Sequence, residues 1–575
     1  MQIIRRPCPD IDHLPDDLHP LLKRLYAARD IRGPAELDYS LNALLPCSEL
    51  HGIEEAVDLL ARTLTAGRRI LIVADFDADG ATACALAVRG LTAMGAKDVR
   101  YVVPNRFEYG YGLSPEIVAV AAEQQPDLII TVDNGIASTD GVAAAGERGI
   151  PVLITDHHLP PAELPAAEAI VNPNLPEDPF PSKHLAGVGV MFYVLIALRT
   201  RLRDSGWFSR QDIGEPNLAQ WLDLVALGTV ADVVPLDHNN RVLVAQGLKR
   251  IRSGSSCAGI RALLAVAGRQ AGQVNAMDLG FFVAPRLNAA GRLTDMTVGI
   301  ECLLTNSDES ARAMAKQLDT LNRERRELQN TMHDDAEKHL AELRDLMPAD
   351  GELPPGLCLF REDWHQGLVG LVASRVKEQV HRPVIAFAPD GNGSLKGSAR
   401  SIPGVHIRDV LDAVATRHPQ LVTKFGGHAM AAGLSLASEC YAAFAEAFAK
   451  EVDRQLGGKS PVGTILSDGG LEPAELSLRT AELIAEAGPW GQGFPEPVFD
   501  GEFEVVERRI VGGRHLSMKL APPGVNRPIK AIAFGTDDSD WPQRVNRVAV
   551  AYRLEVDTFQ GRRQLQLMVD HLTPL

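Results

Sequence analysis

The chain has 575 residues, more than one hydrophobic core can hold, so we expect several domains of about 100–200 residues each. Its 45% hydrophobic and 23% charged residues, with a mean hydropathy of −0.04, are typical of folded globular proteins and exclude a disordered chain. The net charge of −16 does not exclude a nucleic-acid ligand, because such binding depends on local basic patches.

Apolar runs and cysteine usage predict a cytoplasmic protein outside the membrane. No apolar run in the sequence reaches the roughly 20 residues of a membrane span, and the N-terminus lacks a signal-peptide core. The seven cysteines are scattered singly without a CxxC pair, which suits a reducing compartment and argues against a thiolate zinc site. Any metal ligands must therefore be oxygen and nitrogen atoms.

The first half of the chain predicts an α/β domain. Residues 1–48 are expected to form an N-terminal extension packed on a catalytic domain at 49–305. From about Arg69 to Asn172, short apolar runs alternate with Ala-rich helical stretches, which is typical of a parallel sheet. The runs are ILIVAD, VRYVVP, LIITVD, PVLITD and EAIVNP.

The second half predicts a helix, another α/β domain and a β-barrel. The stretch from Ser307 to Leu346 lacks Gly and Pro and predicts a long connecting helix at 306–347. A smaller α/β domain is expected at 348–457, after the Pro and Gly residues at 354–356. Residues 458–575 end in a stretch that alternates with period two between turn residues, which predicts a barrel such as an OB-fold.

Acidic residues end three of the predicted strands, and the carboxyl ends of parallel strands meet at one edge of a sheet. One strand ending in Asp usually means only a turn or a helix cap, but crowded carboxylates repel one another unless cations neutralise them. The residues are Asp75, Asp77 and Asp79 after the first strand, Asp133 after the third, and Asp156, His157 and His158 after the fourth.

The ligand types predict the metal. Carboxylates with one or two imidazoles suit Mn²⁺ or Mg²⁺, with histidine favouring Mn²⁺ and zinc remaining an alternative. A carboxylate shared by two cations would give a two-metal hydrolase, and Asp133 is the candidate bridge. Asp232, where the apolar run LVALGTVADVVPL breaks, offers a further acid, although a surface aspartate is the alternative.

Seven motifs carry a resemblance to a known family. DFDADG, VDNG, TDHH and GTVADVVPL resemble the motifs of the DHH phosphoesterase superfamily, while APRLNAAGRL, LKGSAR and KFGGHAMAAG resemble further signatures of the RecJ single-strand-specific exonucleases. The resemblance covers nearly the whole chain and implies a DHH domain, a DHHA1 domain and a C-terminal OB-fold. It implies that the metal ligands are Asp77, Asp79, Asp133, His157 and Asp232, with Asp75 nearby or additional.

The resemblance also implies substrate contacts. His158 would touch the scissile phosphate. For Asp156 we expect support of a histidine without metal binding, and the same is expected of Asn134. Ser398 and Arg400 would hold a terminal 5′-phosphate. Further contacts with the strand are expected from Arg106, Arg286, Asn288, Gly426, Gly427 and His428. For Arg106 and Arg292 a surface salt bridge is the alternative, and the Gly426–His428 segment is expected to precede a helix whose N-terminus faces phosphate.

Aromatic and basic side chains could also hold a strand. Tyr109 and Tyr111 could stack on bases, with buried packing as the alternative. The barrel offers the mixture of a single-strand groove, with a solvated charged face as the alternative. The barrel residues concerned are Arg514, Lys519, Lys530, Arg553, Phe559, Arg562 and Arg563.

The sequence therefore predicts a metal-dependent 5′→3′ exonuclease that degrades single-stranded DNA to 5′-mononucleotides in repair and recombination. Polarity, product and pathway come from the resemblance, as do a monomeric state and partnership with a helicase and a single-strand-binding protein. One alternative is a DHH phosphodiesterase for short substrates, whose relatives lack the barrel. The other is a non-catalytic DNA-binding protein on a decayed DHH domain.

Overall fold

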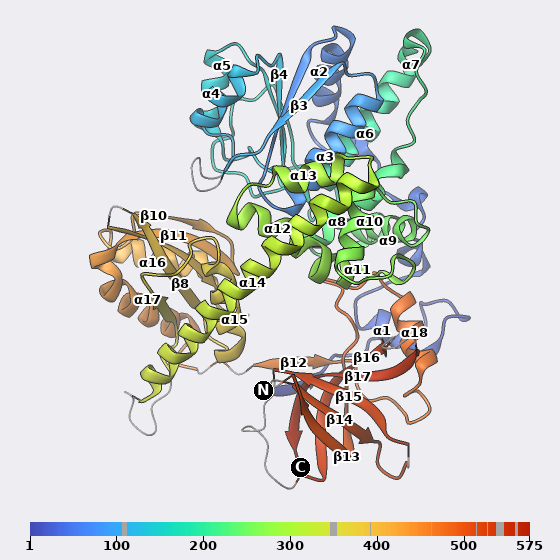
Figure 1. The fold of residues 1–575 in the computed structure, drawn as a ribbon, viewed down its shortest axis with the longest axis vertical. Helices are drawn as coiled ribbons and strands as arrows, with labels where there is room; N and C mark the ends of the chain where they lie inside the picture. Colours follow the sequence, from blue (N-terminus) through green and yellow to red (C-terminus); the bar gives the residue numbers. More distant parts are fainter. Residues whose placement is uncertain are drawn as a thin grey trace. The chain divides into compact units, whose positions relative to one another are not determined.

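The computed structural model describes residues 1–575 except 106–111, 346–352, 392, 460, 462, 513–514, 526, 536–544 and 558–561. The chain forms two compact units (Figure 1). The larger unit contains residues 3–319 and 465–575, and the smaller unit contains residues 1–2 and 320–464. None of the helices in the described part of the chain has the length and apolar character that crossing a membrane requires.

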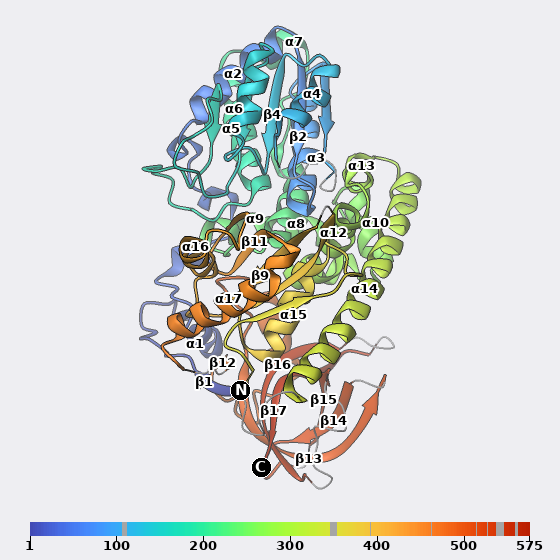
Figure 2. The ribbon, with the colours of Figure 1, turned by 90° about the vertical axis from the view of Figure 1, so that its left-hand side faces the viewer.

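The larger unit contains a parallel sheet, as predicted, whose strands lie in the order β3-β2-β4-β5-β6. The strands are β2 (Arg69–Ala74), β3 (Asp98–Val102), β4 (Leu128–Val132), β5 (Val152–Thr155) and β6 (Ala169–Val171). Figure 2 shows β2 and β4 side by side. Both are buried almost throughout, because helices cover both faces of the sheet, as is usual for parallel sheets.

Helices α4 (Pro115–Glu123) and α5 (Thr139–Glu147) cover one face of this sheet, where Ile117 and Val142 share a core with Val73 and Ile154. On the other side lie α2 (Ile53–Thr65), α3 (Ala78–Ala93) and α6 (Gly187–Asp204) (Figure 1). Helix α8 (Leu222–Ala231) packs against α3 and α6. Its first eight residues are all buried, as expected for a helix that is apolar on every side.

Further helices complete the domain and lead out of it. They are α9 (His238–Arg252), α10 (Ala258–Val266), α11 (Ala276–Asp278), α12 (Ala284–Leu293) and α13 (Thr297–Leu304), with a π-helical turn at Leu279–Val283 before α12. The predicted connecting helix is a single 38-residue helix, α14 (Asp308–Asp345).

The smaller unit has a mixed five-stranded sheet in the order β10-β11-β9-β8-β7. The strands are β7 (Leu357–Phe360), β8 (Val384–Gly391), β9 (Ser394–Arg400), β10 (Lys424–Gly427) and β11 (Ala431–Ala437). Helices α16 (Ile407–Arg417) and α17 (Tyr441–Leu456) pack on one face through a core that includes Phe387 and Leu434. Helix α15 (Val369–Val380) packs on the other face, against Val384 and Ala386.

One local prediction in this unit is wrong. Residues after His428 were expected to form a helix, but Ala431–Ala437 is strand β11, which pairs with β9 and β10. The small residues of this segment alternate between buried and accessible positions, so tertiary pairing outweighs the helix propensity of alanine. Gly426 and Gly427 therefore lie in the hairpin strand β10, and not at a helix N-terminus.

The C-terminal strands close into the predicted barrel, in the order β13-β14-β15-β17-β16. They are β13 (Phe499–Val511), β14 (His515–Ala521), β15 (Ile529–Phe534), β16 (Arg547–Asp557) and β17 (Gln564–Pro574). Parallel pairing of β15 with β17 completes the barrel, whose interior holds Phe499, Phe503 and Tyr552. Helix α18 (Leu478–Glu486) packs against β16 and β17.

The N-terminal segment packs against the linker before the barrel. This linker, defined as residues 465–498, contains α18 and contacts α1 (Pro20–Ala27) through a hydrogen bond from Tyr26 Oη to the Ala487 carbonyl, 2.8 Å long. Beyond α1, the Arg29 guanidinium donates to both carboxylate oxygens of Asp468 at 2.9 Å, and each side chain is only 1% exposed. A buried, bidentate ion pair thus joins two segments that lie far apart in the sequence.

We expect Asp468→Ala to lower the free energy of unfolding of the larger unit by about 3–5 kcal/mol, because the substitution leaves the Arg29 charge buried. Urea unfolding followed by tryptophan fluorescence measures this loss, since Trp490 lies 5.2 Å from the Arg29 guanidinium. The control is Glu502→Ala, which breaks an exposed ion pair with Arg547 and should change stability by less than about 1 kcal/mol. Equal effects of the two substitutions would contradict the prediction.

Candidate metal centre

Acidic side chains meet at one edge of the parallel sheet, as predicted. Asp75, Asp133 and Asp156 directly follow β2, β4 and β5, which are neighbours in the sheet. His157 Nε2 lies 3.1 Å from Asp133 Oδ1 and 3.4 Å from Asp232 Oδ2. Asp232 comes from the C-terminal end of α8, so a helix distant in the sequence completes the cluster.

Three overlapping groups of side chains have ligand atoms within 4.8 Å of one another. Asp133 belongs to two of these groups, which is the position that a ligand shared by two cations needs. His157 also belongs to two groups. The groups are Asp75, Asp77 and Asp133; Asp133, His157 and His158; and Asp79, His157 and Asp232.

Burial and mutual repulsion destabilise the ionised carboxylates of the cluster in the absence of cations. Burial, and then the charges of Asp79, Asp77 and other carboxylates, raise the pKa of Asp133 well above its usual value. The same causes raise the pKa of Asp232, and burial together with the charge of Asp77 raises the pKa of Asp79 to about 7. Divalent cations would stabilise the ionised carboxylates, and carboxylate oxygens with imidazole nitrogen form a donor set that fits Mn²⁺ or Mg²⁺.

The N-terminus of α6 stabilises Asp79, which sequence reasoning missed. The Gly187 and Val188 backbone N–H groups donate to the two oxygens of Asp79 at 2.6 and 3.0 Å, and Asp79 is 1% exposed. A helix N-terminus carries partial positive charge, so it favours the ionised carboxylate. The glycines of the AGVGV stretch at 186–190 could have indicated this contact, since a residue without a side chain allows the backbone to approach a carboxylate closely.

Two glycines allow this close packing. A Cβ atom at Gly187 would lie 2.5 Å from the Asp133 Cβ, and one at Gly228 would lie 2.7 Å from Asp79 Oδ1. Asp133 itself adopts a φ of +62°, a conformation that costs an L-residue free energy and is held by its surroundings. The positions of the carboxylates thus depend on backbone contacts on several sides.

The predicted supporting residues hold the strand ends. Asn134 is fully buried and donates to the carbonyls of Val73 and Val132, which joins β2 to β4. Asp156 Oδ1 lies 2.7 Å from His158 Nδ1, and Asp156 Oδ2 accepts from the Ile136 N–H. Burial opposes protonation of His158, but the hydrogen bond and charge of Asp156 outweigh it and raise the pKa of His158 to about 9.

Comparison with known proteins identifies the family. Residues 69–229 match the DHH family, N-terminal domain, residues 354–457 match the DHHA1 domain, and residues 467–571 match the RecJ OB domain. The chain is 55% identical to the single-stranded-DNA-specific exonuclease RecJ of Dickeya dadantii, over 100% of this chain and 99% of that relative. The chain belongs to the RecJ family.

Solved structures of this family agree with the fold. RecJ of Thermus thermophilus in complex with Mn²⁺ is 32% identical, with a TM-score of 0.78 over 97% of this chain and 76% of that chain. Its complex with Mg²⁺ is 30% identical, with a TM-score of 0.72 over 97% of this chain and 75% of that chain.

Some residues that are expected to contact the DNA strand instead form hydrogen bonds or ion pairs with other residues of this protein. The Asn288 side chain accepts from the Ala78 N–H at 2.8 Å, at the start of α3. Arg286 is buried and pairs with Asp319 at 2.8 Å. Asp77, predicted as a metal ligand, also caps α3 and accepts from the N–H groups of Asp79 and Gly80. Arg106, Tyr109 and Tyr111 lie outside the described residues.

The DHHA1 residues lie in the smaller unit. Arg400 Nη1 donates to Ser398 Oγ at 3.0 Å, and burial lowers the pKa of Arg400. Register places Ser398 opposite Gly433 and Gly433 opposite Gly426, so the three residues form a row across β9, β11 and β10. A Cβ at either glycine would meet open space, so the sheet surface beside Ser398 consists of backbone without side chains. His428 N–H donates to the Ala431 carbonyl in the hairpin turn.

The barrel holds its predicted basic side chains mostly in ion pairs. The pairs are Lys519 with Glu507, Lys530 with Asp557, Arg553 with Glu496 and Asp570, and Arg563 with Glu482. A groove of about 580 Å³ has the basic residues Arg509, Lys519, Arg527, Lys530 and Arg563 in its lining, together with Glu507 and apolar side chains such as Met518. Arg562 is exposed, whereas Arg514 and Phe559 lie outside the described residues.

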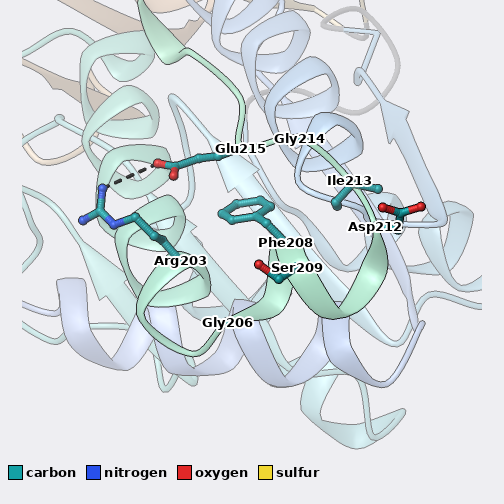
Figure 3. A pocket seen from close by; sticks show the side chains of 8 residues that line it. All are labelled: Arg203, Gly206, Phe208, Ser209, Asp212, Ile213, Gly214 and Glu215. Carbon is teal, nitrogen blue, oxygen red and sulfur yellow. Dashed lines mark ion pairs between the residues drawn. The ribbon is translucent and has the colours of Figure 1, made fainter.

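A separate hollow of about 490 Å³ lies beside α7 (Trp207–Gln211), with Phe208 in its lining and Arg203 paired with Glu215 across it (Figure 3). Trp207 Nε1 donates to the Met94 carbonyl, at the C-terminal end of α3, whereas Asp77 caps the N-terminus of that helix. A helix of 16 residues spans about 24 Å, so this hollow is separate from the metal centre.

We expect Gly187→Ala to weaken Mn²⁺ binding at least about tenfold, because the added methyl group displaces Asp133 and groups that orient metal ligands typically contribute this much. Titration calorimetry of the metal-free protein measures the affinity. The control is Gly146→Ala in α5, where a Cβ meets open space and the substitution should leave metal affinity unchanged. Unchanged affinity in Gly187→Ala would show that the close approach does not position Asp133.

Proposed function

We propose that the protein is a metal-dependent exonuclease that degrades single-stranded DNA in the 5′→3′ direction to 5′-mononucleotides, in DNA repair and recombination. The observation that carries the proposal is the set of overlapping ligand groups around Asp133 at the sheet edge. The name of the 55% identical relative supports the substrate, and the Mn²⁺ and Mg²⁺ complexes support the cofactors.

Two divalent ions, Mn²⁺ or Mg²⁺, would be held by Asp75, Asp77, Asp79, Asp133, His157 and Asp232. Bound there, such ions lower the pKa of a water molecule and neutralise charge on the reacting phosphate. Asp133 would be shared between the ions. His158, whose Nδ1 lies 2.7 Å from Asp156 Oδ1, would donate to an oxygen of the scissile phosphate and stabilise its developing charge.

The strand end would be recognised in the smaller unit. Gly370, in the first turn of α15, lies so close that a Cβ there would be 2.8 Å from Arg400 Nη2 and 2.9 Å from Ser398 Oγ. A guanidinium, a hydroxyl and a helix N-terminus together suit a terminal phosphate dianion. The bare glycine row beside Ser398 leaves room for the first nucleotide, with Gly427 and His428 at its border.

Each segment predicted from the sequence would have its own role in the reaction. Residues 49–305 carry hydrolysis with the N-terminal extension 1–48 packed on them, helix 306–347 connects, and residues 348–457 bind the strand end. The barrel in 458–575 binds the strand further along through its basic groove. Arg106 would add a contact to the DNA backbone, whereas Arg286 and Asn288, which bind Asp319 and the start of α3, would position the segments beside the strand.

Two alternatives are less well supported. A phosphodiesterase for short substrates does not require a barrel with a basic groove, which this chain has. A decayed, non-catalytic DHH domain does not require a complete ligand set, yet all the expected carboxylates and the histidine converge.

The protein would work in the cytoplasm. All seven cysteines are free thiols, which suits the reducing cytoplasm where the DNA substrate is found. A helicase would supply single strands, and a single-strand-binding protein would share the substrate. The protein would act as a monomer.

We expect Asp133→Asn to abolish Mn²⁺-dependent degradation of end-labelled single-stranded DNA while leaving strand binding measurable, because the substitution removes the shared anionic ligand. Initial rates and filter binding measure the two properties. Asp140→Asn, which neutralises an exposed acid in the first turn of α5, is the control and should retain the wild-type rate. Retained turnover in Asp133→Asn would refute the assigned role.

We expect Arg400→Ala to slow degradation of 5′-phosphorylated strands about 10- to 100-fold more than that of 5′-hydroxyl strands, because a charge-assisted hydrogen bond is lost only with the phosphate. Lys396→Ala, four residues earlier on β9 and exposed, should affect both strands equally. Matched initial rates give the comparison. If Arg400→Ala slows both strands equally, Arg400 does not recognise the end.

A further inference from the structure

The loop that follows Asp232 is strained. We define the Asp232 loop as residues 233–236, between the end of α8 and α9. Val233 adopts a φ of +61° and is 64% exposed, although β-branched residues rarely adopt this conformation. Such a backbone costs on the order of 1–3 kcal/mol and persists only where surrounding contacts hold it. The loop begins directly after Asp232, which ends α8 with its N–H bonded to the Gly228 carbonyl.

Hydrogen bonds from two directions fix the far end of the loop. The Leu236 N–H donates to the Gln492 carbonyl at 2.7 Å. Arg241 Nη1 donates to the Leu236 carbonyl at 3.0 Å, and Asn240 Nδ2 donates to the Pro235 carbonyl at 2.9 Å. Arg241 and Asn240 belong to α9, the next helix, whereas Gln492 lies more than 250 residues away in the sequence.

Gln492 belongs to a tight turn in the linker before the barrel, which we call the 490–494 turn. Gly491 and Phe494 exchange two backbone hydrogen bonds, of 2.8 and 3.1 Å. A Cβ at Gly491 would lie 2.7 Å from Leu236 Cδ1, and one at Gly493 would lie 3.1 Å from Pro235 Cβ. Gly493 also has a φ of +71°. Both glycines therefore allow the turn to press directly on the Asp232 loop.

Stacked side chains keep the 490–494 turn rigid. The rings of Trp490 and Phe494 stack 5.0 Å apart at an interplanar angle of 12°. The Arg241 guanidinium lies 4.4 Å from the centre of the Phe494 ring, so one side chain contacts both the turn and the loop. Arg29 lies 5.2 Å from the Trp490 ring and is fixed by Asp468. Both arginines therefore hold the turn through its aromatic rings, as cation–π contacts do.

We infer that the 490–494 turn and Arg241 are positioning elements for the metal centre, which set the place of Asp232 through the Asp232 loop. The linker before the barrel thus contributes to metal binding, in addition to carrying the strand-binding barrel. The inference rests on the proposed function, since it takes Asp232 to be a metal ligand. It deepens that function by making metal affinity depend on a segment that carries no ligand.

The test measures Mn²⁺ affinity of the full-length protein by titration calorimetry, with thermal unfolding measured in parallel. Gly493→Ala presses a methyl group on Pro235, and Arg241→Gln removes the hydrogen bond to Leu236 and the contact with Phe494. We expect each substitution to weaken Mn²⁺ binding about 10- to 100-fold, as for other groups that orient metal ligands. Added Mn²⁺ should restore the rate of DNA degradation, with the KM for DNA unchanged.

Two matched controls separate positioning from general loss of stability. Gly469→Ala introduces a side chain at a φ of +88° in the same linker, but its Cβ meets open space. Arg252→Gln, in the last turn of α9, removes a 2.7 Å hydrogen bond from Arg252 Nε to the Val274 carbonyl, away from the Asp232 loop. Both controls should lower the unfolding temperature and keep Mn²⁺ affinity within about twofold of wild type.

The inference is overturned if Gly493→Ala binds Mn²⁺ as the wild type does, or if Gly469→Ala and Arg252→Gln weaken binding equally. Should Arg241→Gln fail to fold, Gly493→Ala decides. Failure of the proposed function has a different signature, because wild-type protein would then bind Mn²⁺ but leave single-stranded DNA intact. Mn²⁺ affinity would in that case still report on the positioning of Asp232.

Discussion

Repulsion between buried carboxylates is the constraint around which the larger unit is built. Asp75, Asp79, Asp133 and Asp232 lie in a small, largely desolvated space, where like charges repel strongly. A fold can keep such a cluster only if other charges or dipoles offset the repulsion. Divalent cations bound to the carboxylates would offset it, and the protein adds backbone N–H groups from the N-terminus of α6. The same arrangement gives a site where charge on a phosphate can be neutralised.

Backbone contacts, more than side-chain packing, fix the geometry of this cluster. Gly187 and Gly228 let one segment approach another at distances that a methyl group would prevent. Asp133 and Val233 both have positive φ angles. Asp133 is itself a candidate ligand, and Val233 directly follows the candidate ligand Asp232. Conformations of this kind require support from several directions. The hydrogen bonds of Asn134 and Leu236 provide it, and they reach from neighbouring strands and from the C-terminal linker.

Arginines illustrate how one residue type takes different roles in this fold. Arg29 and Arg241 are buried, lie over aromatic rings and join distant segments. Arg286 is also buried and paired with Asp319, although its motif suggests a strand contact. Arg400 instead lies beside Ser398, at the edge of a bare glycine row. The planar guanidinium suits all of these settings, because its N–H donors bind carboxylates, carbonyls and phosphates and its flat face stacks on aromatic rings.

Local patterns in the sequence determined the strands that end in acid, the connecting helix and the barrel, because hydrophobic period and turn residues act over a few neighbouring positions. They also determined that the acids after β2, β4 and β5 meet, since parallel strands share an edge, whereas Asp232 joins them from the end of helix α8. Only the tertiary structure decided that α6 stabilises Asp79, that Asn288 binds the start of α3, and that residues 431–437 form a strand. It alone brought the 490–494 turn to the Asp232 loop. These contacts join segments tens to hundreds of residues apart, and periodicity holds no information about such pairings.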